Sequence, residues 1–131
     1  MTKSELLKSA KEARALSYSP HSGISVGAAL LTKSGKLYLG ANIENAAHSP
    51  ALCAERAAFA RAILDGEREF CAIAVSGGRS GEPSRAIFPP CGVCRQVMAE
   101  FCSPDFEIIL GDTEDTRTVT LGELLPLAFS L

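Results

Sequence analysis

Two short segments far apart in the chain carry the side chains that could do chemistry. Cys53-Ala54-Glu55 supplies one thiol and one carboxylate, and Cys91 and Cys94 supply two more thiols three residues apart. Three thiolates can bind a zinc ion and leave its fourth position open, which is typical of catalytic rather than structural zinc sites. Glu55 is then free to take a proton from water and return it to a substrate. The pattern predicts a catalytic metal centre, whereas Glu55 by itself is typical of an exposed helix face.

The spacing of Cys91 and Cys94 is also found in redox thiol pairs and in structural zinc sites. The redox interpretation is weaker, because it leaves Cys53 and Glu55 unexplained. The chain has five cysteines, an odd number that favours metal binding or free thiols over a disulfide framework. Two cysteines are expected to be packing residues rather than a fourth ligand: Cys71 and Cys102.

Three thiolates around one Zn²⁺ carry a net negative charge, which weakens the effect of the metal on water. A positive partner should therefore lie close to the sulfurs. Arg56 and the N-terminal ends of the helices that carry the cysteines are the candidates in the sequence. Arg95 is a weaker candidate, more typical of a surface or packing residue.

The composition is that of a folded globular protein. The chain has 131 residues, of which 47% are hydrophobic and 21% charged, so we expect a single domain over residues 1–131. The formal net charge of −2 lacks the basic excess that a nucleic-acid-binding surface requires. The N-terminal segment is polar, and no run approaches the roughly 18 apolar residues of a membrane span. These features predict no nucleic-acid or membrane partner and a cytoplasmic location.

Apolar periodicity, caps and turn residues predict the elements that must position these side chains. Helices are expected over residues 2–16, over 53–64 with Ser49 and Pro50 at the start, and over 90–101, and strands over 24–32, 37–43, 70–75, 106–110 and 117–120. The first two strands should form an antiparallel hairpin, and the strands over 70–75 and 106–110 a parallel pair joined by a right-handed crossover. The sheet is therefore predicted to be mixed.

The two cysteine segments fall at the starts of two predicted helices, 53–64 and 90–101. If these helices pack side by side on one face of the sheet, their N-terminal ends bring all three sulfurs to one ion. Backbone N–H groups at a helix start also favour thiolates. The predicted elements are thus arranged as the metal centre requires.

Several motifs together resemble the zinc-dependent cytidine deaminase family, of the short-chain type with three cysteine ligands. The resemblance covers nearly the whole chain and is carried by residues 18–22, 26–29, 40–47, 53–56, 90–97 and 123–126. It implies a three-layer α/β/α fold with a five-stranded mixed sheet, one Zn²⁺ per subunit held by Cys53, Cys91 and Cys94, and a homotetramer. It also implies hydrolytic deamination of cytidine and deoxycytidine, with release of ammonia, in pyrimidine salvage.

The same resemblance implies roles for residues around the metal. Asn42 and Glu44 match the positions that hydrogen-bond the ribose hydroxyls; without the motif they are typical of polar residues that end a strand. Ala54 would offer backbone contacts to the pyrimidine. Phe129 resembles the C-terminal aromatic residue that covers the base from a neighbouring subunit, although an aromatic near a C-terminus is otherwise typical of simple packing.

Three features depart from the family pattern. Ile24 stands where an aromatic residue commonly lines the base pocket, and His48 stands where a tyrosine is common; we expect His48 to be a polar residue near the pocket and not a metal ligand. The loop over residues 77–89 is longer than in compact members, which is compatible with a lid or with an ordinary surface insertion.

These departures leave open a second substrate class, namely modified or N4-substituted cytosine nucleosides or nucleoside antibiotics. An enzyme acting on RNA or DNA is disfavoured because no basic surface is visible. A non-catalytic zinc-binding interaction module is the alternative from outside the enzymes.

Overall fold

The structure is a computed structural model that describes residues 1–85, 87–112 and 114–131; residue 86, within the loop predicted over 77–89, lies outside the described residues. The helices are α1 (Lys3–Ala13), the 3-10 helix η1 (Arg14–Leu16), α2 (Ala54–Leu64), α3 (Gly92–Phe101) and α4 (Leu121–Leu124). The strands are β1 (Ile24–Thr32), β2 (Leu37–Ala41), β3 (Phe70–Arg79), β4 (Glu107–Gly111) and β5 (Thr116–Thr120).

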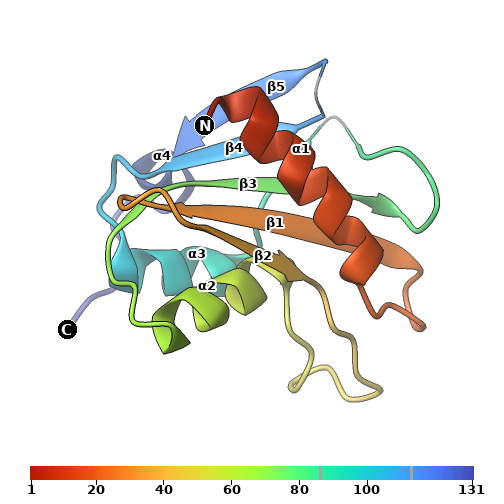
Figure 1. Ribbon diagram of the computed structural model, residues 1–131. Coiled ribbons are helices and arrows are strands. Elements are labelled where there is room, and N and C mark those ends of the chain that lie inside the picture. The colour runs from red at the N-terminus through yellow and green to blue at the C-terminus, as the bar shows by residue number, and fades with distance from the viewer. Residues whose placement is uncertain (86, 113) are drawn as a thin grey trace.

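The five strands form one mixed sheet in the order β2-β1-β3-β4-β5. β3 and β4 run parallel, and all other neighbours in the sheet are antiparallel. α1 covers one face of the sheet, and α2 and α3 lie on the other (Figure 1). The predicted three-layer α/β/α fold with a five-stranded mixed sheet is confirmed.

The α1 side of the sheet is a compact support. α1 begins with the predicted capping box, in which Thr2 Oγ1 accepts from the backbone N–H of Glu5 and the Glu5 carboxylate accepts from the N–H of Thr2. Small and branched apolar side chains of the helix and strands pack together here: Leu6, Leu7, Ala10, Ala29, Ala72, Ala74 and Ile109. This layer holds the sheet from the side opposite α2 and α3.

The larger core lies between the sheet and the pair α2 and α3. Four phenylalanine rings pack in it with centroids 5.0 to 6.4 Å apart: Phe59, Phe70, Phe101 and Phe106. Val26 of β1 and Val75 of β3 face the same core. Large aromatic side chains bury much apolar area and favour specific geometries, so this core fixes both helices on the sheet.

The start of α2 lies against β2 because Gly40 has no side chain. A Cβ at Gly40 would overlap the carbonyl oxygen of Ala54 and the backbone nitrogen of Ala58. The close approach brings the first turn of α2 to the sheet near the end of β2. Cys53 and Glu55 are thereby placed beside the segment that follows this strand.

The predicted start of the second helix is wrong. α2 begins at Ala54 with Cys53 as its N-cap, and not at Ser49 and Pro50. Leu52 pairs with Ile43 in an isolated antiparallel bridge, which keeps the chain extended up to the helix. The same bridge replaces the end of the predicted strand over 37–43, and β2 ends at Ala41. Long-range pairing therefore overrides a favourable local cap.

β3 is longer than predicted, because it extends to Arg79 instead of ending at residue 75. β1 pairs with β3 along its whole length, from Ile24 opposite Arg79 to Thr32 opposite Phe70. These backbone hydrogen bonds recruit Gly77 into the sheet although glycine itself disfavours a strand. The first part of the predicted loop over 77–89 is therefore a strand.

β5 leads directly into α4. Thr120 and Glu123 form the capping box that their spacing predicts. The tail beyond α4 ends in exposed apolar side chains: Leu127, Phe129 and Leu131. Within the described ranges, no helix has the length and apolar character needed to cross a membrane.

Candidate metal and catalytic site

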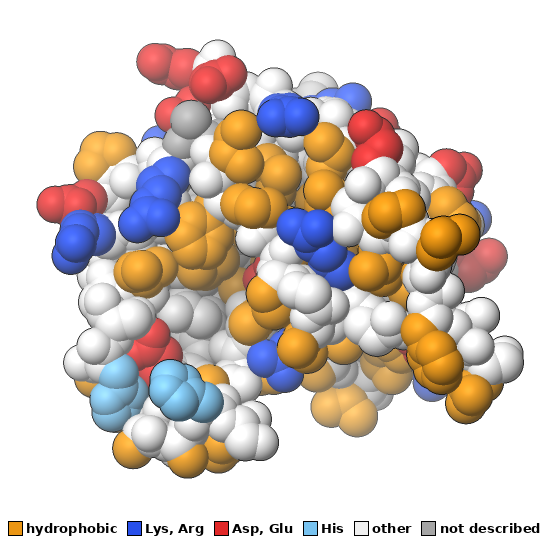
Figure 2. All heavy atoms as spheres, turned by 180° about the vertical axis from the view of Figure 1, so that it is seen from behind, with side chains coloured by type: hydrophobic (Ala, Val, Ile, Leu, Met, Phe, Trp, Pro, Cys, Tyr) orange, Lys and Arg blue, Asp and Glu red, His pale blue; other side chains and the backbone are white. Residues whose placement is uncertain are grey.

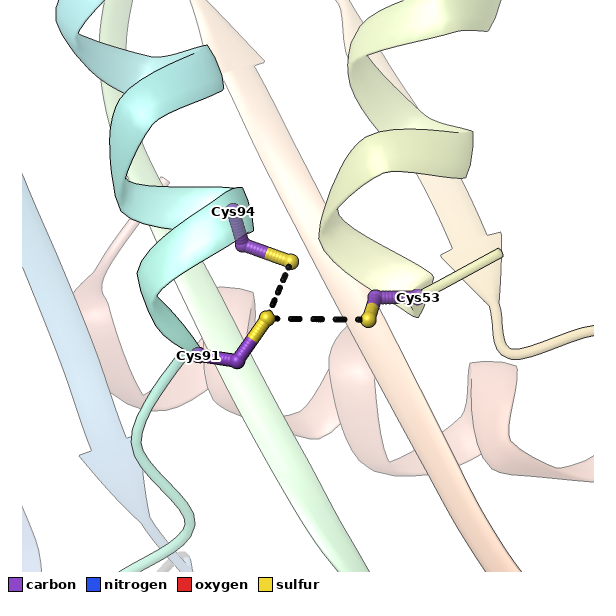
Figure 3. Close-up of side chains that lie close together, drawn as sticks. All are labelled: Cys53, Cys91 and Cys94. Atoms are coloured by element: carbon purple, nitrogen blue, oxygen red, sulfur yellow. Dashed lines mark hydrogen bonds between the residues drawn. The ribbon is translucent and has the colours of Figure 1, made fainter. Parts of the chain in front are cut away.

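Three cysteine sulfurs from two helix starts meet at one point. Cys53 is the N-cap of α2, Cys91 is the N-cap of α3, and Cys94 lies in the first turn of α3. The Sγ atoms of Cys53 and Cys91 are 3.9 Å apart, and those of Cys91 and Cys94 are 3.5 Å apart (Figure 3). All three sulfurs lie within 4.8 Å of one another. The structure brings together the thiols that the sequence predicts as ligands.

The triangle of sulfurs has the size that a zinc ion requires. Three sulfurs bound to a tetrahedral ion at ~2.3 Å lie about 3.8 Å from one another. The observed separations of 3.5 and 3.9 Å are close to this value, and the cysteines are free thiols. In the part of the chain that the structure describes, these residues are the one cluster of His, Cys, Asp or Glu with metal-ligand spacing.

The chemistry of the donors also fits a divalent cation. A hydrogen bond with Cys94, together with the Arg56 guanidinium, lowers the pKa of the Cys53 thiol to about 5. The hydrogen bond with Cys53, and after it burial, raises the pKa of Cys94, because only the thiol form of Cys94 can donate to the Cys53 thiolate. A divalent ion resolves the conflict, since it favours the thiolate form of every ligand.

Arg56 lies beside the sulfurs, as predicted for a charge-compensating residue. Its Nη2 donates to Cys53 Sγ at 3.4 Å and to the carbonyl oxygen of Ala51 at 3.2 Å. The hydrogen bond to Cys53 raises the pKa of the guanidinium. The Nε of Arg56 is buried and has no hydrogen-bond partner among the described residues. The guanidinium can therefore offset part of the thiolate charge.

Arg95 makes a different set of contacts. Its Nε donates to the carbonyl oxygen of Pro90 at 2.7 Å, and its Nη1 donates to that of Leu124 at 2.8 Å. These bonds join the start of α3 to α4. Arg95 is thus a packing residue, which agrees with the role that the sequence favoured for it over charge compensation.

Glu55 is a buried carboxyl group in the wall of a cavity, with only 4% of the residue exposed. Burial, and after it the negative charge of Cys53, raises the pKa of Glu55 to about 7. A carboxyl group with a pKa near neutrality can both accept and donate a proton at physiological pH. The alternative in which Glu55 is an exposed helix residue is wrong.

The cavity has a volume of about 400 Å³, within the range of small-molecule sites. Its wall comes from the start of β1, the segment after β2, the start of α2 and the segment before α3. Sixteen of the described residues contribute: Ser22, Ile24, Val26, Asn42, Ile43, Glu44, His48, Ala51, Leu52, Cys53, Ala54, Glu55, Arg56, Phe88, Pro89 and Cys91. Figure 2 looks onto a hollowed face of the molecule, with the histidine side chains (pale blue) beside the hollow.

The cavity wall contains all but one of the predicted substrate-binding residues: Ile24, Asn42, Glu44, His48 and Ala54. His48 is exposed and lies outside the metal-ligand cluster, as expected for a polar residue near the pocket. Their binding roles stay predictions.

Asn42 is held firmly by the backbone around it. Its Oδ1 accepts from the N–H of Val26 at 2.9 Å and from the hydroxyl of Ser17 at 2.6 Å. Its Nδ2 donates to the carbonyl oxygen of Ile24 at 2.9 Å. An amide nitrogen has two hydrogens, so one donor of Asn42 is available to a ligand.

Glu44 is presented as an ionised acceptor. Its carboxylate accepts from the Ser22 hydroxyl and, at 2.9 and 3.0 Å, from the backbone N–H groups of His21 and Ser22. These hydrogen bonds, that of the Ser22 hydroxyl first, lower the pKa of Glu44. A fixed carboxylate at the cavity wall can accept further hydrogen bonds from hydroxyl groups.

Phe129 lies outside the cavity of its own chain. The residue is 68% exposed, and its backbone carbonyl accepts from Gln96 Nε2 at 3.1 Å. The resemblance implies that Phe129 contacts the base of a nucleoside bound in a neighbouring subunit, and this contact stays a prediction.

Seven described wall residues are absent from the predicted set: Ser22, Val26, Ile43, Ala51, Leu52, Phe88 and Pro89. Ser22 lies in the motif over residues 18–22 that carries part of the family resemblance, so this motif could have indicated that Ser22 belongs to the site. Phe88 precedes the predicted ligand Cys91 by three residues, so the segment that leads to α3 must pass the sulfur cluster. The short separation from Cys91 in the sequence could therefore have indicated that Phe88 lies in the cavity wall. The role of the loop that contains Phe88 was left open by the sequence.

The two cysteines outside the cluster differ. Cys102 is half-buried against the larger core, and burial raises the pKa of its thiol to about 12, so its predicted packing role is confirmed. Cys71 is exposed, and its predicted packing role is wrong. The pairing of β1 with β3 shifts where Leu31 faces Ala72 and Thr32 faces Phe70, which skips Cys71. Such an irregularity turns a side chain away from the regular strand alternation.

Comparisons with known proteins agree with this site. The model of the cytidine and deoxycytidylate deaminase zinc-binding region matches residues 1–109. A protein from Sporosarcina psychrophila named cytidine deaminase is 47% identical over 130 residues, which cover 96% of this chain and 90% of that protein. The crystal structure of cytidine deaminase from Burkholderia pseudomallei matches with a TM-score of 0.89 and 45% identity, covering 98% of this chain and 100% of that chain. A more distant relative, named blasticidin-S deaminase, from Bacillus cereus, is 32% identical over 80% of this chain and 76% of its own length.

Proposed function

The chain belongs to the cytidine and deoxycytidylate deaminase family, and on this premise we propose that it is a zinc-dependent hydrolase of the amino group of cytidine and deoxycytidine. The products are uridine or deoxyuridine and ammonia. The observation that carries the proposal is the cluster of three cysteines beside a buried Glu55, in the wall of a cavity of nucleoside size.

Cys53, Cys91 and Cys94 would hold the Zn²⁺, which when bound supplies the Lewis acidity that turns water into a nucleophile near neutral pH. Arg56 offsets part of the negative charge of the thiolates through its contact with Cys53. Cys94 is buried, Cys53 is half-buried and Cys91 is exposed, so water can reach the cluster at Cys91.

Glu55 moves the protons of the reaction. A water oxygen adds to C4 of the pyrimidine, and the bond from C4 to the amino nitrogen breaks. Glu55 accepts a proton from the water, gives it to the ring nitrogen N3, and carries the second proton to the departing amino group. Its pKa of about 7 suits both directions of transfer.

The opposite part of the cavity recognises the nucleoside. The Glu44 carboxylate accepts from the ribose hydroxyls, and the remaining Nδ2 hydrogen of Asn42 donates to one of them. Ala54, whose backbone begins α2 at the cavity wall, contacts the pyrimidine. These roles follow from the family resemblance and are supported by the location of the three residues.

The proposal extends to the oligomeric state, the cellular location and the pathway. Residues 1–131 form one domain that assembles into a homotetramer, in which Phe129 reaches the cavity of a neighbouring copy. The exposed apolar tail supports this assembly, because isolated chains seldom expose large apolar side chains together. Free thiols on the described cysteines suit a reducing compartment, so pyrimidine salvage in the cytoplasm is the proposed setting.

A second candidate is the deamination of modified or N4-substituted cytosine nucleosides or nucleoside antibiotics. It is favoured by Ile24 and His48, which both line the cavity, and by the relative named blasticidin-S deaminase. A non-catalytic zinc-binding module is disfavoured, because such a protein has no need of a buried carboxyl group beside the metal ligands.

The test is ammonia release and loss of cytosine absorbance by zinc-loaded protein, with Glu55→Gln protein as the blank. We expect cytidine and deoxycytidine to be consumed with the highest kcat/KM in a panel that includes N4-modified nucleosides and blasticidin S. A higher kcat/KM for the modified compounds would establish the second candidate. Stoichiometric zinc without ammonia release from any member of the panel would leave only the binding module.

A further inference from the structure

One aromatic ring stands out in the wall of the cavity. Phe88 is the one Phe, Tyr or Trp residue among the described residues that line it. It is half-buried and packs against the larger core. A pyrimidine base has two flat faces, and aromatic side chains are the protein groups that contact such faces best.

The ring of Phe88 occupies a space that the sequence leaves empty on β3. A Cβ at Gly77 would lie 2.6 Å from both Cγ and Cδ1 of Phe88 and 2.9 Å from Cδ2. Three ring atoms at nearly equal distances mean that the ring lies over the Cα of Gly77, where a side chain would project. The ring therefore belongs to the sheet wall although its backbone belongs to the segment before Cys91.

The ring completes a continuous surface with two residues of β1. Val26 lies directly opposite Gly77 in the antiparallel pair of β1 and β3. Ile24 lies two residues before Val26, so both side chains are on the sheet face that Phe88 covers. Residues diagonally opposite in such a pair have Cα atoms about 7 to 8 Å apart, within reach of an aromatic side chain.

Arg85, three residues before Phe88, is fixed to the same point. The N–H of Arg85 donates to the carbonyl oxygen of Gly77 at 2.8 Å, and the guanidinium carbon of Arg85 lies 5.7 Å from the centroid of the Phe88 ring. The cation can attract the ring electrons and limit its rotamers. Phe88 is held in place before any substrate arrives.

We propose that Phe88 is a specificity-determining residue that contacts the pyrimidine ring of the substrate. It supplies the aromatic surface that the aliphatic Ile24 and Val26 cannot supply from the neighbouring strand. The proposal rests on the proposed function, because it assumes that a cytosine nucleoside occupies the cavity.

The kinetic test replaces the ring by an aliphatic side chain that still covers Gly77. Phe88→Leu is expected to lower kcat/KM for cytidine about tenfold, chiefly by raising KM, whereas Phe88→Tyr keeps it near that of the wild type. Ile87→Val is the matched control, because Ile87 is the exposed neighbour of Phe88 and is not part of the cavity wall. An unchanged KM in Phe88→Leu protein that contains zinc and releases ammonia would overturn the proposal and leave the proposed function intact.

A binding test uses the absence of tryptophan from the chain. In Phe88→Trp protein, titration with the product uridine should quench the tryptophan fluorescence, because the base contacts the new ring. In Ile87→Trp protein the same titration should leave the emission unchanged. If uridine inhibits both variants competitively but quenches neither, or quenches both alike, Phe88 does not contact the base.

Discussion

The two sides of the cavity are built differently. The metal side consists of the wall residues Cys53, Glu55 and Cys91, together with the buried Cys94 that completes the sulfur cluster. These residues sit on the starts of two helices packed on the sheet. The nucleoside side consists of strand ends and connecting segments: Ile24, Asn42, Glu44, His48 and Phe88.

The difference lies in how each side is fixed. On the metal side, Glu55 and Cys94 are buried, and the helices that carry them are held by the larger core. On the nucleoside side, Asn42 and Glu44 are held by hydrogen bonds to nearby backbone groups, and His48 is exposed. Reacting atoms tolerate little displacement, whereas recognition can be altered one side chain at a time. We therefore expect changes on the metal side to abolish chemistry and changes on the nucleoside side to alter KM.

The largest effect is expected from Cys53→Ala. Removal of one of three thiolates should weaken zinc binding by more than about a hundredfold and abolish ammonia release. The zinc content of purified protein, measured by atomic emission, checks this. Cys71→Ala is the control, since Cys71 is exposed and outside the cluster, and should keep full zinc and activity. Stoichiometric, tightly bound zinc in the Cys53 variant would contradict the ligand assignment.

Glu55→Gln should separate chemistry from metal binding on the same side of the cavity. The amide fills the same volume but cannot carry protons, so we expect kcat to fall by about a thousandfold or more while zinc stays bound. Single-turnover ammonia release and zinc content measured on the same sample check this. A variant that retains a tenth or more of the wild-type kcat would show that another group moves the protons.

Glu44→Gln tests the nucleoside side. Loss of the charged acceptor should raise KM for cytidine about tenfold, with a smaller change in kcat and none in zinc content. Initial rates over a range of cytidine concentrations measure both constants. Glu12→Gln, on the exposed surface of α1, provides a charge-matched control. A fall in kcat with unchanged KM would mean that the two sides are not separable in the way described.

The smallest effect is expected from Gly77→Ala. The added methyl group must displace the ring of Phe88, which should raise KM severalfold and lower the free energy of unfolding by about 1 to 2 kcal/mol. Steady-state kinetics and urea unfolding measure the two changes. Gly35→Ala strains a glycine with φ of +92° outside the cavity wall, so it should lower stability without changing KM. If KM rises by the same factor in both variants, the effect comes from general destabilisation and not from displacement of the Phe88 ring.

The sequence predicted the metal side more completely than the nucleoside side. Cys53 and Glu55 are two residues apart in the chain, and Cys91 and Cys94 are three residues apart, so local spacing already encodes their joint chemistry. The antiparallel hairpin of β1 and β2 and the parallel pair of β3 and β4 also follow from the pattern of strands and helices. The cysteines and Glu55 come together because α2 and α3 start at the same end of the sheet, as the fold provides (Figure 1).

The rest depended on pairing that local patterns do not reveal. The start of α2 was misplaced because the bridge between Ile43 and Leu52 extends the chain past Ser49 and Pro50. The exposure of Cys71 depends on a register shift between β1 and β3. The position of Phe88 depends on a missing side chain at Gly77, eleven residues earlier, a complementarity that exists only in the folded chain.

The four α-helices among the described residues begin in two distinct ways. α1 and α4 start with complete capping boxes, whereas the ligand-bearing α2 and α3 start at cysteines that make no side-chain capping hydrogen bond. A serine or aspartate at an N-cap typically contributes about 1 kcal/mol, which these two helices forgo. Their first turns instead depend on thiolate charge, and that charge is stable only when the ligands share a cation. Demetallation should therefore fray both helix starts together, and amide hydrogen exchange there would report metal occupancy before the rest of the fold responds.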